Sequence, residues 1–139
     1  MAIYHCSIKN IGRSDGRSAV ACSAYRAAQK LRDKETGILH DFTKKTEVIY
    51  SEIFLCKNAP AEYADRETLW NEVQKIEKNK NARLAREWEL ALPNELTVEQ
   101  SKKLVFHLHQ AQLSSVHLCL IYKSSFLSVP ISHFLLSVL

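Results

Sequence analysis

The stretch AIYHCSIKNIGRSDGRSAVACSAYRAAQKLR, residues 2–32, carries a strand pattern, a turn-rich loop and a helix pattern in that order. Residues 2–9 are rich in β-branched and aromatic side chains, which favours a β-strand. Two of the three glycines follow in IGRSDGRS, which predicts a loop. Ser18 can then cap a helix that runs to about Arg32. The many alanines of this helix favour helical structure and leave a small-residue face that can pack closely on a sheet.

The segments that follow extend this beginning into an α+β pattern. After the first strand and helix, apolar periodicity and turn residues predict two more strands, a helix and a further strand that ends at Pro93. A capping box of Thr97 and Gln100 then predicts the start of a last helix. The order β-α-β-β-α-β-α predicts one α+β domain with a mainly antiparallel sheet. The segments are GILHDFTKK (37–45), TEVIYSEIFL (46–55), RETLWNEVQKIEKNK (66–80), RLAREWELAL (83–92) and the helix from Thr97 onward.

The charged side chains are concentrated in the front of the chain. Of 34 charged residues, 33 lie in residues 1–103, and only Lys123 lies beyond them. Apolar residues make up 46% of the chain, which excludes a wholly disordered protein. Residues 1–45 carry nine Lys and Arg against four Asp and Glu. That excess suits contact with phosphates, although an ordinary soluble surface explains it as well.

The cysteines and the N-terminus indicate a cytoplasmic protein. The four cysteines show neither a CxxC pair nor a spacing typical of a zinc site, so we expect them to be small buried side chains in a reducing compartment. The N-terminal sequence MAIYHCSIKN lacks the uninterrupted apolar region of a secretory signal.

Tyr25 is the first candidate for chemistry, because three arginines lie near it in the sequence. A phenol could attack a phosphodiester, but it is a weak nucleophile unless a base or a metal-polarised phosphate assists it. Arg13, Arg17 and Arg26 are candidate contacts to DNA phosphates. The structural alternative is a half-buried tyrosine that packs on the sheet with its hydroxyl at the rim.

Glu87 is the second candidate, since a strand carboxylate could be an oxygen ligand for a divalent cation. The alternative is an ordinary surface ion pair with Arg83 or Arg86, which are close in sequence. A third pattern is the His-x-His spacing of His107 and His109, which resembles a pair of metal ligands. It continues the helix that begins at Thr97, however, where residues two apart face different directions, and this argues against a metal site.

Several separated blocks together resemble the N-terminal part of the MobA/MobL family of plasmid relaxases. The resemblance covers residues 1–105 and lies in MAIYH (1–5), GRSAVA (16–21), AYR (24–26), DRETLWN (65–71) and ALP (91–93). It implies an HUH-type relaxase domain that nicks one DNA strand at a plasmid transfer origin. It also implies single-stranded origin DNA as substrate, other mobilisation proteins as partners, and a divalent metal, Mg²⁺ or Mn²⁺.

The resemblance also assigns roles to individual residues. The family's catalytic tyrosine corresponds to Tyr25, whose attack would leave a 5′-phosphotyrosyl link and a free 3′-hydroxyl. Glu87 matches an acidic position in or near the metal site. The family's Asn-Pro-His-x-His block does not occur in this sequence. We therefore expect an incomplete metal site and a chain that nicks DNA poorly or not at all by itself.

Residues 106–139 fall outside the resemblance and form an apolar, serine-rich segment. A truncated or frameshifted gene would produce such an end. A membrane tail is a second interpretation, although Lys123 and Pro130 make a weak span. A divergent subdomain that completes the sheet differently is the third. The corresponding functional alternatives are a non-catalytic remnant or accessory protein that binds single-stranded DNA, and a membrane-tailed interaction protein.

Overall fold

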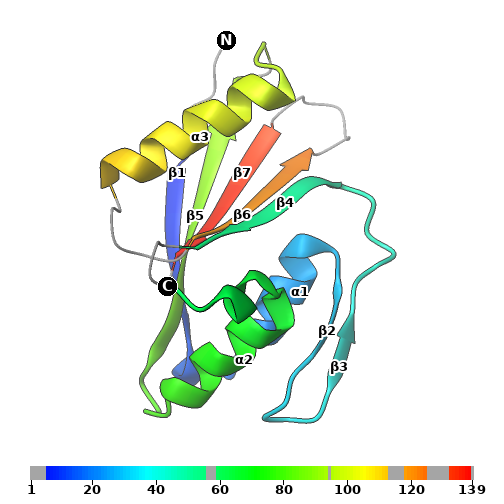
Figure 1. Cartoon of the computed structure of the whole chain (residues 1–139), viewed down its shortest axis with the longest axis vertical. Coiled ribbons are helices and arrows are strands. Elements are labelled where there is room, and N and C mark those ends of the chain that lie inside the picture. Colours follow the sequence, from blue (N-terminus) through cyan, green and yellow to red (C-terminus); the bar gives the residue numbers. More distant parts are fainter. Residues whose placement is uncertain (1–5, 56–58, 94, 113–117, 125–131, 139) are drawn as a thin grey trace.

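The computed structural model describes residues 6–55, 59–93, 95–112, 118–124 and 132–138 (Figure 1). Strands and helices are interspersed along the chain, and the helices pack on one main sheet. In chain order they are β1 (Cys6–Gly12), α1 (Ala19–Ala27), β2 (Lys30–Arg32), β3 (Leu39–Asp41), β4 (Val48–Phe54), α2 (Arg66–Ile76), β5 (Arg83–Leu92), α3 (Val98–Gln112), β6 (Leu118–Ser124) and β7 (Ser132–Val138).

The main sheet is antiparallel throughout, with the strand order β1-β5-β7-β6-β4. The short strands β2 and β3 form a separate antiparallel hairpin. This arrangement confirms the α+β class predicted from the sequence. The first strand ends later than the predicted residue 9, because β1 continues through part of the expected loop to Gly12; residues 2–5 of the predicted strand lie outside the described ranges.

Helices cover both faces of the main sheet. Side chains alternate between the two faces of a strand, and along β4 they contact different helices. Ser51 accepts a hydrogen bond from Arg66 at the start of α2, whereas the ring of Phe54 lies 5.7 Å from the ring of Phe106 on α3. The side chain of Lys102, also on α3, lies over the neighbouring ring of Tyr50. Hence α2 lies on one face and α3 on the other.

Helix α1 is shorter than the sequence pattern predicts. It ends at Ala27, and Ala28 adopts a left-handed conformation with a φ of 53° while its N–H bonds to the carbonyl of Ala24. The chain then turns into β2, where the buried Leu31 is paired in register with His40. The apolar spacing at Leu31 fits both a helix and a strand, so the pairing of β2 with β3 decides between them.

The core lies between α1, α2 and the start of the sheet. The alanines of α1 bring this helix close to β1 and β5, and Trp70 of α2, which is 2% exposed, closes the space beside it. Trp70 is therefore a packing residue. The buried cluster comprises Ile11, Ala19, Val20, Ala24, Ala27, Leu31, Trp70, Leu84 and Ala85.

The starts of α2 and α3 agree with the sequence prediction, whereas the end of α2 does not. The capping box before α3 is present: Thr97 N donates to Gln100 Oε1 at 2.9 Å, and Gln100 N donates to Thr97 Oγ1 at 3.3 Å. His107 and His109 lie in α3, as the pattern predicts. Helix α2 ends at Ile76, before the predicted end at residue 80, and Ile76 itself is 69% exposed.

The last described segments occupy the middle of the main sheet. Strand β7 pairs with β5 on one side and with β6 on the other, and β6 alone joins the edge strand β4 to the sheet. The boundary expected at residue 105 falls inside α3. Within the described ranges, no helix has the length and apolar character needed to cross a membrane.

Candidate functional site

A buried polar cluster fixes the beginning of α1, the helix that carries Tyr25. The hydroxyl of Ser18 donates to Asp33 Oδ2 at 2.6 Å and accepts from the N–H of Ala21 at 3.2 Å. Gln74 of α2 accepts from the N–H of Val20 and donates to the other carboxylate oxygen of Asp33. Helix α1 is therefore tied to both the β2–β3 hairpin and α2.

Asp33 is the centre of this cluster and has no exposed surface. Burial alone would raise the pKa of its carboxyl group, but hydrogen bonds from Ser18, Gln74 and the N–H groups of Glu35 and Thr36 outweigh burial and lower the pKa. Asp33 is consequently a charged, fully buried anchor at neutral pH. Sequence reasoning missed this residue, whose only signal is its position at the turn of the hairpin.

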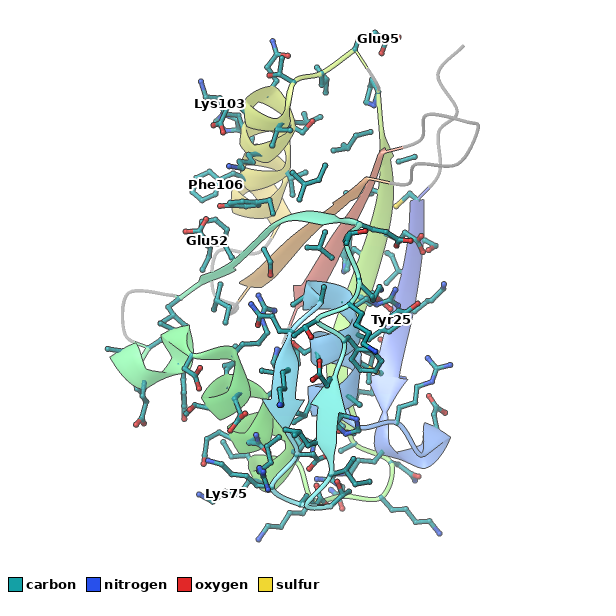
Figure 2. All side chains as sticks on the ribbon, turned by 90° about the vertical axis from the view of Figure 1, so that its right-hand side faces the viewer. Tyr25, Glu52, Lys75, Glu95, Lys103 and Phe106 are labelled. Carbon is teal, nitrogen blue, oxygen red and sulfur yellow. The ribbon has the colours of Figure 1, made fainter. Side chains whose placement is uncertain are left out.

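Tyr25 lies near the end of α1 (Figure 2) and is 44% exposed. Its ring meets the ring of Phe42, which follows β3, edge to face with the centroids 5.3 Å apart. The tyrosine thus packs against Phe42 at the end of the β2–β3 hairpin. A phenol in this position is accessible to a large substrate.

Glu87 lies on β5 beneath α1 and is only 3% exposed. Its carboxylate is paired with Arg26, the residue after Tyr25: Oε1 lies 2.6 Å from Nε, and Nη2 donates to Oε2 at 2.8 Å. The prediction of a surface ion pair between Glu87 and Arg83 or Arg86 is therefore wrong. Those residues are neighbours in sequence, but their side chains are exposed whereas Glu87 faces the helix.

Lys45, in the segment between β3 and β4, also reaches Tyr25. Its Nζ lies 3.5 Å from the ring centroid and donates to the main-chain carbonyl of Tyr25 at 3.1 Å. Sequence reasoning missed Lys45 as well. The pair Lys44-Lys45 is visible in the sequence, but its spacing from Tyr25 does not show which lysine folds back onto α1.

Of the three arginines proposed as phosphate contacts, the structure brings one directly to Tyr25. Arg26 Cζ lies 5.8 Å from the tyrosine ring centroid. Arg13 forms a bidentate pair with Glu35 and donates to the main-chain carbonyls of Gln74 and Glu77 at the end of α2. Arg13 therefore holds the hairpin to α2.

Arg17 is exposed just before α1, and its charge acts on Cys22 of the same helix. Burial raises the pKa of the Cys22 thiol, and the charge of Glu87 raises it further, while Arg26 and Arg17 act in the opposite direction. A thiol with a raised pKa is a poor nucleophile at neutral pH. Cys22 is therefore not a candidate nucleophile at neutral pH.

The described residues do not fit a divalent metal. Within the described ranges, no group of three or more His, Cys, Asp or Glu side chains lies close enough together to hold an ion. The Oε1 atom of Glu87 is buried and accepts no well-directed hydrogen bond, yet the Arg26 guanidinium already lies against it. A guanidinium in that position occupies the space and balances the charge that a metal ion would need.

Comparison with known proteins gives consistent matches. The MobA/MobL family profile matches residues 17–120. The chain is 48% identical over 104 residues to the mobilization protein MobL of Acidithiobacillus ferridurans, a match covering 75% of this chain and 27% of that protein. It is 38% identical over 115 residues to the conjugal transfer protein TraA of Agrobacterium fabrum, covering 76% of this chain and 10% of that protein.

A solved structure is also similar. It is described as "Molecular Basis of Vancomycin Resistance Transfer in Staphylococcus aureus", and it matches 99% of this chain and 71% of its own with a TM-score of 0.85 and 32% identity. The chain therefore shares its fold with that protein. It spans 27% or less of the length of the two curated relatives named above.

Proposed function

This chain belongs to the MobA/MobL family, and on that premise we propose that it takes part in plasmid mobilisation as a strand-specific DNA nickase with Tyr25 as nucleophile. The observation that carries this proposal is the half-exposed phenol of Tyr25, which lies inside the family match and is flanked by the cations of Arg26 and Lys45. Relatives named for mobilisation and conjugal transfer support the biological role.

The proposed reaction is a transesterification at one phosphodiester. The Tyr25 hydroxyl oxygen attacks phosphorus, a Tyr–O–P bond forms, and the P–O3′ bond breaks. The electron pair of that bond leaves on O3′, which takes up a proton to become a free hydroxyl, while the phenol proton passes to solvent. The DNA end stays attached through a 5′-phosphotyrosyl bond, so a later attack by a 3′-hydroxyl can rejoin the strand.

Residues around Tyr25 would hold the helix end and balance the phosphate charge. The Arg26–Glu87 pair ties the last turn of α1 to the main sheet, and Ser18 ties the first turn to Asp33. Fixed positions matter because charge stabilisation is effective when the cations are already in place as negative charge develops on the phosphate. Arg17, which is exposed, is a further candidate for contact with the DNA backbone.

We propose that this chain nicks DNA weakly when alone. The family resemblance implies Mg²⁺ or Mn²⁺, which would polarise a phosphate oxygen when bound. The described residues supply one candidate carboxylate, Glu87, and its charge is balanced by Arg26. No step of the proposed reaction is therefore assigned to a metal.

The test uses a supercoiled plasmid that carries a transfer origin, incubated with the purified chain and Mg²⁺ or Mn²⁺. A covalent DNA–protein adduct on a denaturing gel, absent in Tyr25→Phe, would support Tyr25 as nucleophile. Tyr25-dependent relaxation as fast as that of a full-length relative would overturn the proposal of weak activity. An adduct that persists in Tyr25→Phe would overturn the assignment of the nucleophile.

A non-catalytic protein that binds single-stranded DNA is the second candidate function. The Arg26 guanidinium that balances the charge of Glu87, the candidate metal carboxylate, favours it. Salt-dependent binding of single-stranded DNA without any covalent adduct would select this alternative. In either case we propose origin DNA and other mobilisation proteins as partners, and the cytoplasm as the compartment.

The origin of residues 106–139 is a separate proposal. The family match extends to residue 120, and the strands β6 and β7 lie in the middle of the sheet. Both observations support the interpretation in which this segment completes the sheet, and a frameshifted or truncated gene remains the competing explanation. Reading the downstream nucleotide sequence in all three frames would decide, since an Asn-Pro-His-x-His block in another frame would favour the frameshift.

A further inference from the structure

The turn between β3 and β4 places one lysine directly on the nucleophile's ring. The N–H of Lys45 donates to the carbonyl of Phe42 at 3.0 Å, which closes the turn, and Phe42 itself packs edge to face on Tyr25. The Lys45 ammonium then lies 3.5 Å from the Tyr25 ring centroid, in the range of a cation–π contact. Both the turn and the ring therefore fix the position of this ammonium.

The ammonium group of Lys45 has hydrogen-bond donors left for an anion. An ammonium group has three N–H donors, and the hydrogen bond to the Tyr25 carbonyl uses one of them. Among the described residues, no carboxylate lies within ion-pair distance of Lys45. Arg26, the other cation near the tyrosine ring, has its charge balanced by Glu87, with contacts of 2.6 and 2.8 Å.

We propose that Lys45 is the phosphate-binding residue of the Tyr25 site. Its ammonium holds a non-bridging oxygen of a DNA phosphodiester beside the phenol, and the ligand class is the backbone of single-stranded DNA. The proposal rests on the proposed function of Tyr25 and adds a residue that contacts the substrate. A lysine suits this role because it is a compact point charge with several donors on a flexible stem.

The test measures the salt dependence of binding to fluorescein-labelled oligo-dT by fluorescence anisotropy. The variants are Lys45→Met, Lys45→Gln and Lys45→Arg, and the matched control is Lys44→Met, which removes the same charge from the adjacent, exposed position. Loss of one phosphate contact should make the plot of log K against log salt shallower by about 0.7. We expect that change in both neutral Lys45 variants and not in Lys45→Arg or Lys44→Met.

A second readout separates this role from a merely structural one. At saturating origin DNA, Lys45→Met should form the covalent adduct about 100-fold more slowly than the unsubstituted chain, because the lost ammonium acts on the reacting phosphate. Lys45→Arg should recover most of that rate. The urea midpoints of all four variants are compared, so that a loss of binding caused by unfolding is recognised.

The outcomes distinguish this proposal from the proposed function. If the unsubstituted chain binds oligo-dT and the neutral Lys45 variants keep its salt slope, the role of Lys45 is overturned while DNA binding stands. An equal change in Lys44→Met and Lys45→Met would also overturn it, because it would indicate general surface charge. If the unsubstituted chain neither binds DNA nor forms an adduct, both proposals fail together.

Discussion

Replacing Ser18 with alanine should destabilise the protein far more than the loss of an ordinary helix cap. The substitution removes the cap of α1, which is worth about 1 kcal/mol. It also removes the donor that bonds Asp33 Oδ2 at 2.6 Å. A hydrogen bond to a charged group is worth about 1.5–3 kcal/mol, so we expect a total loss of about 3 kcal/mol in the free energy of unfolding.

The assay is urea unfolding followed by the fluorescence of the buried Trp70, and the control is Asp65→Ala. Asp65 caps α2 through a 2.8 Å bond from the N–H of Thr68, but it is exposed and bonds no buried charge. Its loss should cost about 1 kcal/mol. The reasoning fails if the two substitutions cost the same, since the bond to Asp33 would then contribute nothing.

The difference between Ser18→Ala and the unsubstituted chain should also depend on pH. The hydrogen bond from Ser18 helps to lower the pKa of Asp33, so its contribution is complete above the usual aspartate range. It is lost as the pH falls through the lowered pKa of the folded state. The separation of the two urea midpoints should therefore shrink below about pH 4, toward the smaller difference caused by loss of the helix cap alone, and midpoints that stay equally separated in acid would contradict this account.

Two further substitutions and one truncation test other parts of the structure by the same urea assay. Arg26→Ala leaves the carboxylate of Glu87 buried without a cation and should lower the free energy of unfolding by about 2–3 kcal/mol. The control Arg86→Ala, at an exposed position of β5, should change it by less than about 0.5 kcal/mol. Equal effects of the two substitutions would contradict a role of the Arg26–Glu87 ion pair. A chain that ends at residue 112 lacks β6 and β7, the strands that join β4 to β5. It should lose cooperative unfolding, and a sharp transition would show that the front part folds alone. Gly37→Ala places a side chain at a φ of +74° and should cost about 1 kcal/mol; an unchanged midpoint would contradict the left-handed turn.

Local signals in the sequence predict the class of the fold and many of its elements. Apolar alternation and strand-favouring side chains predict β1, β3, β4 and β5, and the caps Ser18 and Thr97 each precede a helix in the structure, whereas the sequence pattern predicts helix at β2 and no strand at β6 or β7. These signals are local, because a cap or an alternating pattern acts on residues only a few positions away. The blocks that resemble the MobA/MobL family also belong to the sequence, and they singled out Tyr25.

The residues that meet around Tyr25 are brought together by long-range packing. The ion partner of Glu87 is Arg26, 61 positions earlier, and not an arginine on its own strand. Lys45 reaches Tyr25 because the β2–β3 hairpin folds back on α1. The same hairpin ends α1 at Ala27, since burial of Leu31 in β2 outweighs its helical spacing. Contacts between distant segments depend on how the whole chain packs, and a single sequence does not contain that information in local form.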